Sequence, residues 1–212
     1  MAMDFSNMLQ QLSIWALPVL TAVVLHELAH GYSAYLLGDS TAARMGRLTL
    51  NPLAHVDLFG TILLPVMLII SGSPFLFGYA KPVPVNFGNL RHPRRDMVYV
   101  AAAGPAMNLI LAGLSAFVLK FLFALQLIDD GLVARSLLAS VMINVVLAVF
   151  NLFPLPPLDG GRVATGLLPR QPAMALARLE PYGMLIVMLL LMTGIMGDIL
   201  RPMTSLLLNA LL

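Results

Sequence analysis

The chain has 212 residues, of which 59% are hydrophobic and only 10% are charged, and its formal net charge is +2. A soluble domain carries about 25% charged residues, so this composition excludes a soluble globule and indicates an integral membrane protein whose surface faces the lipid bilayer. The small net charge provides no basic surface for nucleic acid, and the absence of cysteine excludes disulfide bonds, thiolate metal ligands and a cysteine nucleophile.

The first predicted element is a transmembrane helix over residues 8–37 that ends at Gly38, since glycine commonly terminates helices. No Lys or Arg precedes its apolar run, so the charge pattern of a cleaved signal peptide is missing and we expect the helix to be retained. A polar stretch follows over residues 39–57, and within it residues 47–50 have the pattern of a short strand.

Two irregular segments come next. Residues 58–72 are interrupted by glycine and proline and are shorter than the roughly 20 residues that a membrane span requires. We expect them to enter the bilayer and return on the same side, and a true span is the alternative. Residues 78–90 alternate around Pro82 and Pro84, which favours an extended hairpin or loop over a helix.

Three further apolar stretches predict helices over residues 96–128, 132–153 and 182–200, and an apolar tail occupies residues 203–212. The expected fold class is therefore an all-α polytopic membrane protein with about four to five transmembrane helices. A re-entrant segment and a short extended or β-hairpin element near the functional site complete the expected architecture.

The positive charges predict how the chain is oriented in the membrane. If the loops 39–57 and 73–95 and the segment 159–178 share the cytoplasmic side, that side holds nine of the twelve Lys and Arg residues. Cytoplasmic segments are generally enriched in these residues, so we expect this orientation. The nine residues are Arg44, Arg47, Lys81, Arg91, Arg94, Arg95, Arg162, Arg170 and Arg178.

Residues 26–30 read His-Glu-Leu-Ala-His, an HExxH sequence within the first helix. The spacing of four residues places the His26 and His30 imidazoles on one helical face, where both can bind one Zn²⁺. Glu27 is then placed to take a proton from a water molecule on the metal, which is the general-base role in zinc hydrolases. The alternative is a polar patch with satisfied hydrogen bonds, but ionisable residues inside an apolar span are costly and generally serve a function.

A catalytic zinc site commonly has three protein ligands and one water, so a third ligand is needed. Asp159 is the best candidate, because three prolines within residues 154–157 end the preceding helix and the glycine pair after Asp159 allows a sharp turn around the carboxylate. The alternative is an aspartate that caps the next helix, a common role for this residue type. The presence of the HExxH sequence favours the ligand.

Three motifs follow one another along the chain: the HExxH sequence, Gly-Pro-Ala-Met-Asn at 104–108, and residues 151–162. Their order and spacing, over about two-thirds of the chain, resemble the site-2 protease family of intramembrane zinc metalloproteases. Residues 51–57 and 80–86 are similar to the compact bacterial branch of that family, and this sequence has no PDZ-like or CBS-like module.

The resemblance implies a three-helix catalytic core in which His26, His30 and Asp159 bind one Zn²⁺ per chain and Glu27 is the general base. It also implies that Asn151 holds the substrate backbone or the oxyanion. The implied partners are the lipid bilayer and a transmembrane protein substrate, single-span and already trimmed by another protease. The implied location is the bacterial cytoplasmic (inner) membrane, with the active site toward the cytoplasm.

No repeat or linker divides the chain, so we expect a single intramembrane metalloprotease domain over residues 1–212. Its catalytic core is expected over about 8–168, and the C-terminal helices over about 173–212. The sequence does not predict the substrate's identity or the oligomeric state.

Several other positions have both a functional and a structural interpretation. The Asn151 amide can donate to a developing oxyanion, whereas Asn144, seven residues earlier on the same face, is expected to hold helices together. Gly104 permits close helix packing, and Asn108 is expected to bond across to the first helix. Three roles remain possible for His55: it supports a metal ligand, it lies near the metal as a fourth nitrogen, or it organises a local turn.

Two functions of other classes remain as alternatives. A zinc-binding but proteolytically inactive membrane scaffold has no need of the carboxylate of Glu27. A metal or proton transporter needs polar groups along its whole path, whereas the polar residues here cluster near one depth. A protease is therefore favoured over both.

Overall fold

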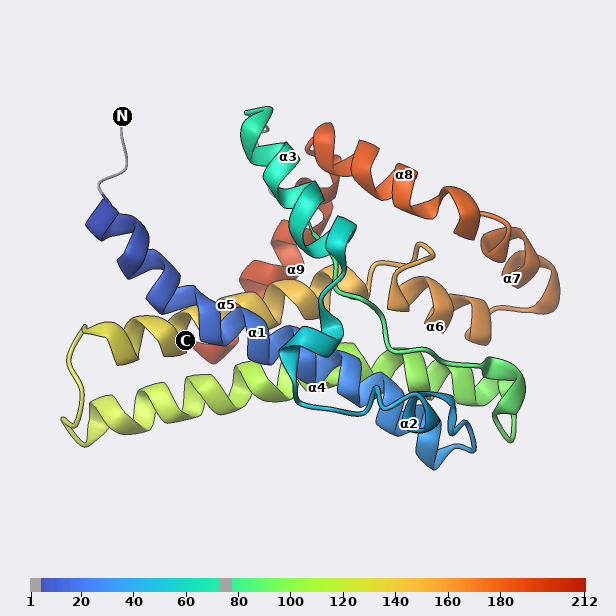
Figure 1. Cartoon of the computed structure of the whole chain (residues 1–212), viewed down its shortest axis with the longest axis horizontal. Helices are drawn as coiled ribbons and strands as arrows, with labels where there is room; N and C mark the ends of the chain where they lie inside the picture. Colours follow the sequence, from blue (N-terminus) through green and yellow to red (C-terminus); the bar gives the residue numbers. More distant parts are fainter. Residues whose placement is uncertain (1–4, 73–77) are drawn as a thin grey trace.

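The computed structural model describes residues 5–72 and 78–212, and all the regular secondary structure in these ranges is helical (Figure 1). This confirms the predicted all-α class. In chain order the elements are α1 (Phe5–Leu36), α2 (Thr41–Arg44), η1 (Pro52–His55), η2 (Leu58–Leu63), α3 (Leu64–Ile70), η3 (Phe87–Asn89), α4 (Pro93–Ala124), α5 (Leu132–Asn151), α6 (Asp159–Leu167), α7 (Arg170–Ala177), α8 (Glu180–Met192) and α9 (Ile195–Leu211).

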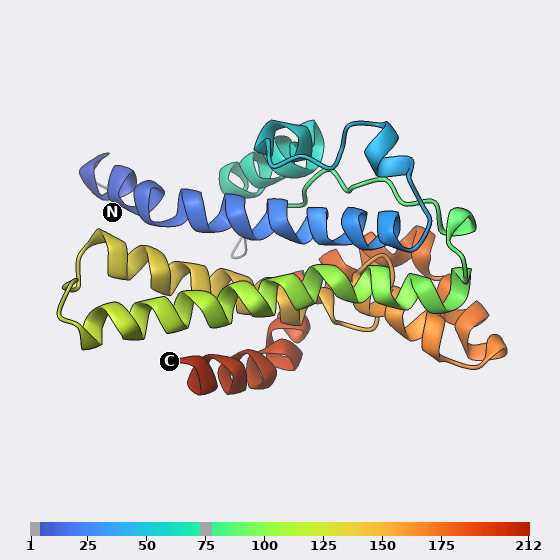
Figure 2. The same ribbon diagram turned by 90° about the horizontal axis from the view of Figure 1, so that it is seen from below.

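Three long helices, α1, α4 and α5, form the centre of the molecule. They run side by side and each contacts the other two, while α9 lies against α5 on the side away from α1 (Figure 2). Because lipid tails are as apolar as leucine, helices in membranes associate through close packing, which small side chains allow. The buried small side chains of these three helices include Ala22, Ala34, Ala101, Ala112, Ala116 and Ala148.

The end of α1 agrees with the predicted terminus. Gly38 has a φ of +116°, a conformation that glycine adopts without the steric cost of a Cβ. The Asp39 N–H donates to the Ala34 carbonyl at 2.9 Å, which satisfies a carbonyl that the helix leaves unpaired. The chain then turns back over α1 through α2 and η1.

The expected count of four to five membrane spans is not confirmed. By length and composition, the described residues contain three helices able to cross a membrane: Leu9–Leu36 within α1, α4 and α5. A fourth is reached only if α7 and α8, which are bent by 68° at their junction, count as one broken span. The expected helix over 182–200 is interrupted at Gly194, whose φ is +78°. Helix α8 therefore has 13 residues, which is about 20 Å against a hydrocarbon core of roughly 30 Å.

The predicted β-hairpin is not confirmed. Residues 78–86 run alongside α1 as a segment without regular structure, and no strand is present there or at 47–50 in the described part of the chain (Figure 2). Pro82 and Pro84 have no N–H to donate, so this segment cannot form a continuous strand ladder. Residues 73–77, where the chain leads into this segment, lie outside the described residues.

The apolar segment that was expected to re-enter the membrane is a short helix, η2 followed by α3. Asp57 begins it by accepting a hydrogen bond from the Gly60 N–H at 2.7 Å. The helix Leu58–Ile70 is too short to count among the candidate spans. Whether it re-enters or crosses therefore stays a prediction.

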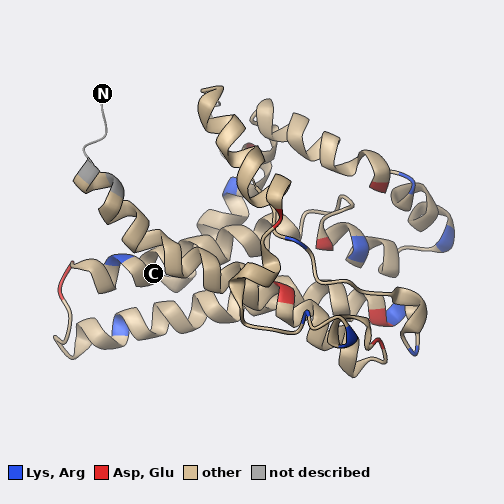
Figure 3. Ribbon diagram, viewed as in Figure 1, with Lys and Arg blue, Asp and Glu red and all other residues tan. Residues whose placement is uncertain are grey.

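Charged residues are distributed unevenly along the three-helix centre. Most Lys and Arg residues gather at the end where α1 finishes and α4 begins, and few lie at the opposite end near the α4–α5 connection (Figure 3). This is the end that contains the loops for which the charge rule predicts the cytoplasmic side.

Candidate metal centre

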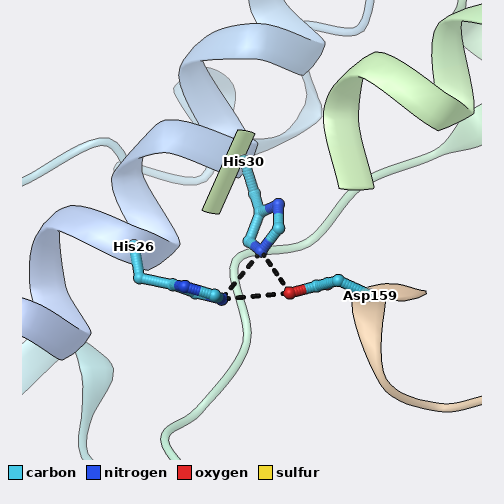
Figure 4. Close-up of side chains that lie close together, drawn as sticks. All are labelled: His26, His30 and Asp159. Atoms are coloured by element: carbon cyan, nitrogen blue, oxygen red, sulfur yellow. Dashed lines mark hydrogen bonds and ion pairs between the residues drawn. The ribbon is translucent and has the colours of Figure 1, made fainter. Parts of the chain in front are cut away.

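Helices α1 and α6 bring the three predicted ligands together (Figure 4). The His26 and His30 Nε2 atoms lie 3.0 Å apart, one helical turn from each other on α1. The Asp159 Oδ2 atom lies 3.2 Å from His26 Nε2 and 3.3 Å from His30 Nε2. All three residues are at most 9% exposed. The three atoms thus form a nearly equilateral triangle in the protein interior.

The donor set of this triangle fits a zinc ion. His30 Nδ1 lies 2.7 Å from the Val100 carbonyl and His26 Nδ1 lies 2.6 Å from Asn108 Oδ1, so each Nδ1 donates its proton away from the centre. A neutral imidazole that carries its proton on Nδ1 has a lone pair on Nε2, which is the form that binds a metal ion. The Asp159 Oδ2 atom is buried without a hydrogen-bond partner. Three facing lone pairs repel one another unless a cation lies between them, and tetrahedral zinc ligands are about 3.3 Å apart.

Gly104 provides the space that the two imidazoles occupy. A Cβ at this position would contact His30 Nε2 and lie 2.6 Å from His26 Nε2. The predicted role of Gly104 was close helix packing. The structure shows that the groups packed against it are the candidate ligands themselves.

We expect Gly104→Ala to lower zinc affinity at least about tenfold, the effect typical of disturbing the orientation of metal ligands. The added methyl group displaces both imidazoles from the triangle. Gly113→Ala is the matched control, because it lies on the same helix and its Cβ would have no heavy atom within 4 Å. Competition with a zinc chelator measures both variants, and equal affinities would contradict this role of Gly104.

Asp159 is positioned by a tight connection between α5 and α6. It is the first residue of α6, and the N-cap position before it is Leu158, so Asp159 is not the N-cap residue that the alternative interpretation expected. Gly160 and Gly161 were expected to permit a sharp turn, but neither has a positive φ. They are needed for close approach instead, because a Cβ on Gly160 would collide with the Leu152 carbonyl and one on Gly161 with the backbone of Pro156.

Glu27 faces a different neighbour. It follows His26 on α1 and is rotated by about 100° around the helix, toward the segment 78–86. The Val83 N–H donates to Glu27 Oε2 at 2.8 Å. Val83 is the one residue between Pro82 and Pro84, so its N–H is the single backbone donor of that triplet. A Cβ on Gly31 would lie 2.7 Å from Val83 Cγ1, which shows how closely this segment approaches α1.

Asp39, just beyond α1, anchors the far end of the same segment. Its carboxylate accepts hydrogen bonds from the Asn86 N–H at 2.7 Å, the Asn89 side chain at 2.9 Å and Thr41. Burial raises the pKa of Asp39, and the hydrogen bonds lower it further than burial raises it, so the net pKa lies below the usual range. The stabilising contribution of this carboxylate is therefore present above its unfolded-chain pKa of about 3.9 and is lost as the pH falls through the folded pKa.

Two comparisons with known proteins decide the family. Residues 122–194 match the model of Peptidase family M50. YwhC of Bacillus subtilis (strain 168), which is named a zinc metalloprotease, is 40% identical over 202 residues, covering 92% of this chain and 88% of YwhC. The chain belongs to peptidase family M50. This confirms the predicted membership of the site-2 protease family and, with it, the prediction of a metalloprotease.

Two further relatives are longer than this chain. Rip2 of Mycolicibacterium smegmatis, also named a zinc metalloprotease, is 32% identical over 176 residues, which are 82% of this chain and 64% of Rip2. Rip2 of Mycobacterium tuberculosis (strain H37Rv) is 33% identical over 144 residues, which are 66% of this chain and 52% of that protein. No solved structure matches this chain.

Asn151 and His55 have hydrogen-bond partners outside the set of candidate ligands. Asn151 is the last residue of α5, within the range matched by the M50 model, and its side chain donates to the Leu147 carbonyl of the same helix at 3.0 Å. Its contact with a substrate stays a prediction. His55 Nε2 donates to the Thr49 carbonyl at 2.9 Å, so this ring organises a turn and is not a member of the metal-binding group.

Asn108 and Asn144 are both fully buried in this M50 core. Asn108 bonds across to α1, as expected, and Asn144 joins α5 to α4 through Asn108. Nothing in the sequence indicates that Asn108 contacts a ligand ring directly. The sequence also carries no signal for the Val83 N–H and the Val100 carbonyl, because backbone groups are present at every position.

Proposed function

We propose that this M50 protein is a zinc endopeptidase that hydrolyses peptide bonds within transmembrane segments of other membrane proteins, with one Zn²⁺ per chain. The observation that carries the proposal is the triangle of His26, His30 and Asp159, in which the two histidines and the adjacent Glu27 lie on the apolar helix α1. The names of YwhC and Rip2 as zinc metalloproteases support the choice of metal.

Each residue has a distinct role in the proposed reaction. His26 and His30 hold the ion through Nε2, and Asp159 holds it through Oδ2. The chemistry that Zn²⁺ supplies when bound is Lewis acidity, which makes water more acidic and polarises a peptide carbonyl. The Val83 N–H donates a hydrogen bond to Glu27 Oε2, which leaves the other carboxylate oxygen available for proton transfer. That oxygen accepts a proton from the attacking water and later delivers it to the leaving amine.

The direct test is cleavage by purified protein reconstituted in liposomes with a single-span model substrate. Mass spectrometry of the products locates the cut. We expect a cut inside the hydrophobic span that disappears when zinc is removed. A cut confined to the soluble flanks would contradict intramembrane proteolysis.

We also propose that the protein resides in the bacterial cytoplasmic (inner) membrane with the metal centre toward the cytoplasm. The supporting observations are the apolar candidate spans and the basic residues gathered at the end of the bundle where α1 finishes. In this arrangement the polar loop 39–57 and the segment 78–86 border the route by which water reaches Glu27, and the helix Leu58–Ile70 re-enters the bilayer without crossing it.

The re-entrant arrangement predicts that the two ends of Leu58–Ile70 are accessible from the same side of the membrane. The chain lacks cysteine, so single cysteines report without background. Met45→Cys and Ser71→Cys place a thiol at exposed positions before and after the segment. We expect both thiols to react with a membrane-impermeant maleimide only when the cytoplasmic face is accessible. Labelling of the two positions from opposite sides would show that the segment crosses.

The proposed substrate is a single-span membrane protein that another protease has already trimmed. A transmembrane helix has its carbonyls locked in backbone hydrogen bonds, so a stretch of it must unwind before it can be cut. We propose that the unwound stretch adds along the segment 78–86 by backbone pairing and that Asn151 holds it from the other side. Because the Val83 N–H is engaged by Glu27, this pairing must use other backbone groups of the segment.

The substrate proposal predicts two changes in turnover. Asn151→Ala should retain zinc, since the Asn151 amide donates to the Leu147 carbonyl and is not one of the three candidate ligands. It should lose about 10²-fold or more in turnover, as removal of an oxyanion donor does. A central Gly-Pro pair in the substrate span should speed cleavage, because it weakens the helix. The reconstituted assay compares the two substrates and the two proteins. Equal rates in both comparisons would contradict the proposal that the substrate unwinds and is held by Asn151.

We further propose that residues 1–212 act as one metalloprotease domain, with a catalytic core over about 8–168 and C-terminal helices over about 173–212. Packing of α9 on the core supports this proposal. Leu200, Leu207, Leu208 and Leu211 of α9 contact the buried cluster that contains Val141 and Val145 of α5.

A further inference from the structure

A buried line of side-chain hydrogen bonds leads from the candidate metal centre across three helices. His26 on α1 bonds to Asn108 on α4 at 2.6 Å, and Asn108 bonds to Asn144 on α5 at 2.8 Å. Asn144 in turn bonds to the carbonyl of Ser140 at 2.9 Å. Asn108 and Asn144 are 0% exposed, so solvent cannot substitute for any of these partners.

The direction of every hydrogen bond in this line is determined by two backbone carbonyls. A carbonyl only accepts, so the atom of Asn144 facing the Ser140 carbonyl must be Nδ2, and Oδ1 then faces Asn108. The atom of Asn108 that lies 3.2 Å from the Ala22 carbonyl must likewise be Nδ2. Both N–H groups of Asn108 are thereby used, one on Ala22 and one on Asn144, and its Oδ1 must face His26.

The hydrogen bond with Asn108 therefore determines the tautomer of a neutral His26 ring. Asn108 presents an acceptor to His26 Nδ1, so Nδ1 carries the proton and Nε2 is left with a lone pair directed at Asp159 and His30. If the Asn108 amide were reversed, its N–H group would face Nδ1 and favour the proton on Nε2, where it blocks metal binding.

We propose that Asn108, held in one orientation by Asn144, is a positioning residue that sets the tautomer of His26 and thereby the affinity for zinc. This inference rests on the proposed zinc function of the triangle. Partners of this kind, behind the ligands, typically contribute 10–100-fold to metal affinity. Because the line joins α1, α4 and α5, the orientation of His26 depends on the packing of these three helices.

The first test is zinc affinity measured by chelator competition on the purified full chain. We expect Asn108→Leu, which removes the acceptor, to weaken binding about 10–100-fold. Asn144→Leu keeps that acceptor but releases the amide from one of its two anchors, so its loss should be smaller and still measurable. Ser115→Ala is the matched control, since it removes the 2.8 Å bond between Ser115 and Ser140 that also joins α4 to α5 and leaves the line to His26 intact.

The second test reads the tautomer directly and does not depend on activity. The chain has four histidines, so histidine-selective ¹⁵N labelling gives a simple spectrum. In zinc-free protein we expect His26 to carry its proton on Nδ1, and Asn144→Leu to shift part of the population to Nε2. This variant retains Asn108, so its spectrum remains informative if Asn108→Leu fails to fold.

The outcomes separate this inference from the function on which it rests. If the unmodified protein binds no zinc, the proposed function fails. If the unmodified protein binds zinc, and both asparagine variants bind it as tightly as Ser115→Ala, the positioning role fails and the function stands. An unchanged His26 tautomer in Asn144→Leu would also overturn the inference.

Discussion

Glu27→Gln should reduce peptide-bond hydrolysis by about 10²–10⁴-fold, the contribution typical of a general acid–base residue, while the protein retains its zinc. Glutamine has the size of glutamate, and its carbonyl oxygen can still accept the Val83 N–H, which lies 2.8 Å from Glu27 Oε2. The neutral amide cannot accept a proton from water. The variant therefore separates chemistry from folding and from metal binding.

The chain has only one other glutamate, Glu180, which serves as the control. It is exposed and forms a 3.5 Å ion pair with Arg162, which is worth little at the surface. Glu180→Gln should leave the cleavage rate of the reconstituted substrate unchanged. If Glu27→Gln cleaves as fast as Glu180→Gln, Glu27 is not the general base. If the unmodified protein binds zinc but cleaves no substrate, the alternative of an inactive scaffold is favoured.

His26→Ala and Asp159→Ala should each lose the bound zinc. The binding free energy of a structural zinc site, about 10–16 kcal/mol over four ligands, gives roughly 3 kcal/mol or about 10²-fold for each ligand. The zinc content of the purified variants, measured by elemental analysis, should fall from about one per chain toward zero, and cleavage should be lost in parallel.

Matched controls for this prediction exist at exposed positions. His92 and Asp198 are the same residue types on the surface, away from the triangle. His92→Ala and Asp198→Ala should retain zinc and activity. If His26→Ala and Asp159→Ala retain as much zinc as these controls, the ligand assignment is wrong.

Local patterns in the sequence were sufficient for the long helices and for two of the three candidate metal ligands. The sparse charges indicated a membrane protein, the apolar runs placed α1, α4 and α5 to within a few residues, and Gly38 marked the end of α1. The spacing of His26 and His30 placed both rings on one face, because helical periodicity relates residues four apart. Asp159 was chosen by the chemistry that two histidines leave incomplete.

Only the tertiary structure brought Asp159 within 3.2 Å of His26, and only the tertiary structure selected which distant groups surround the site. Asn108 is 82 positions from His26, and Val83 is 56 positions from Glu27. Helical and strand periodicities act over a few residues and say nothing about such pairs. The expected hairpin is likewise not confirmed, and the expected helix over 182–200 is divided at Gly194 into α8 and α9. Both features depend on backbone hydrogen bonding and on how the chain packs. The periodicity of apolar residues does not report either of these.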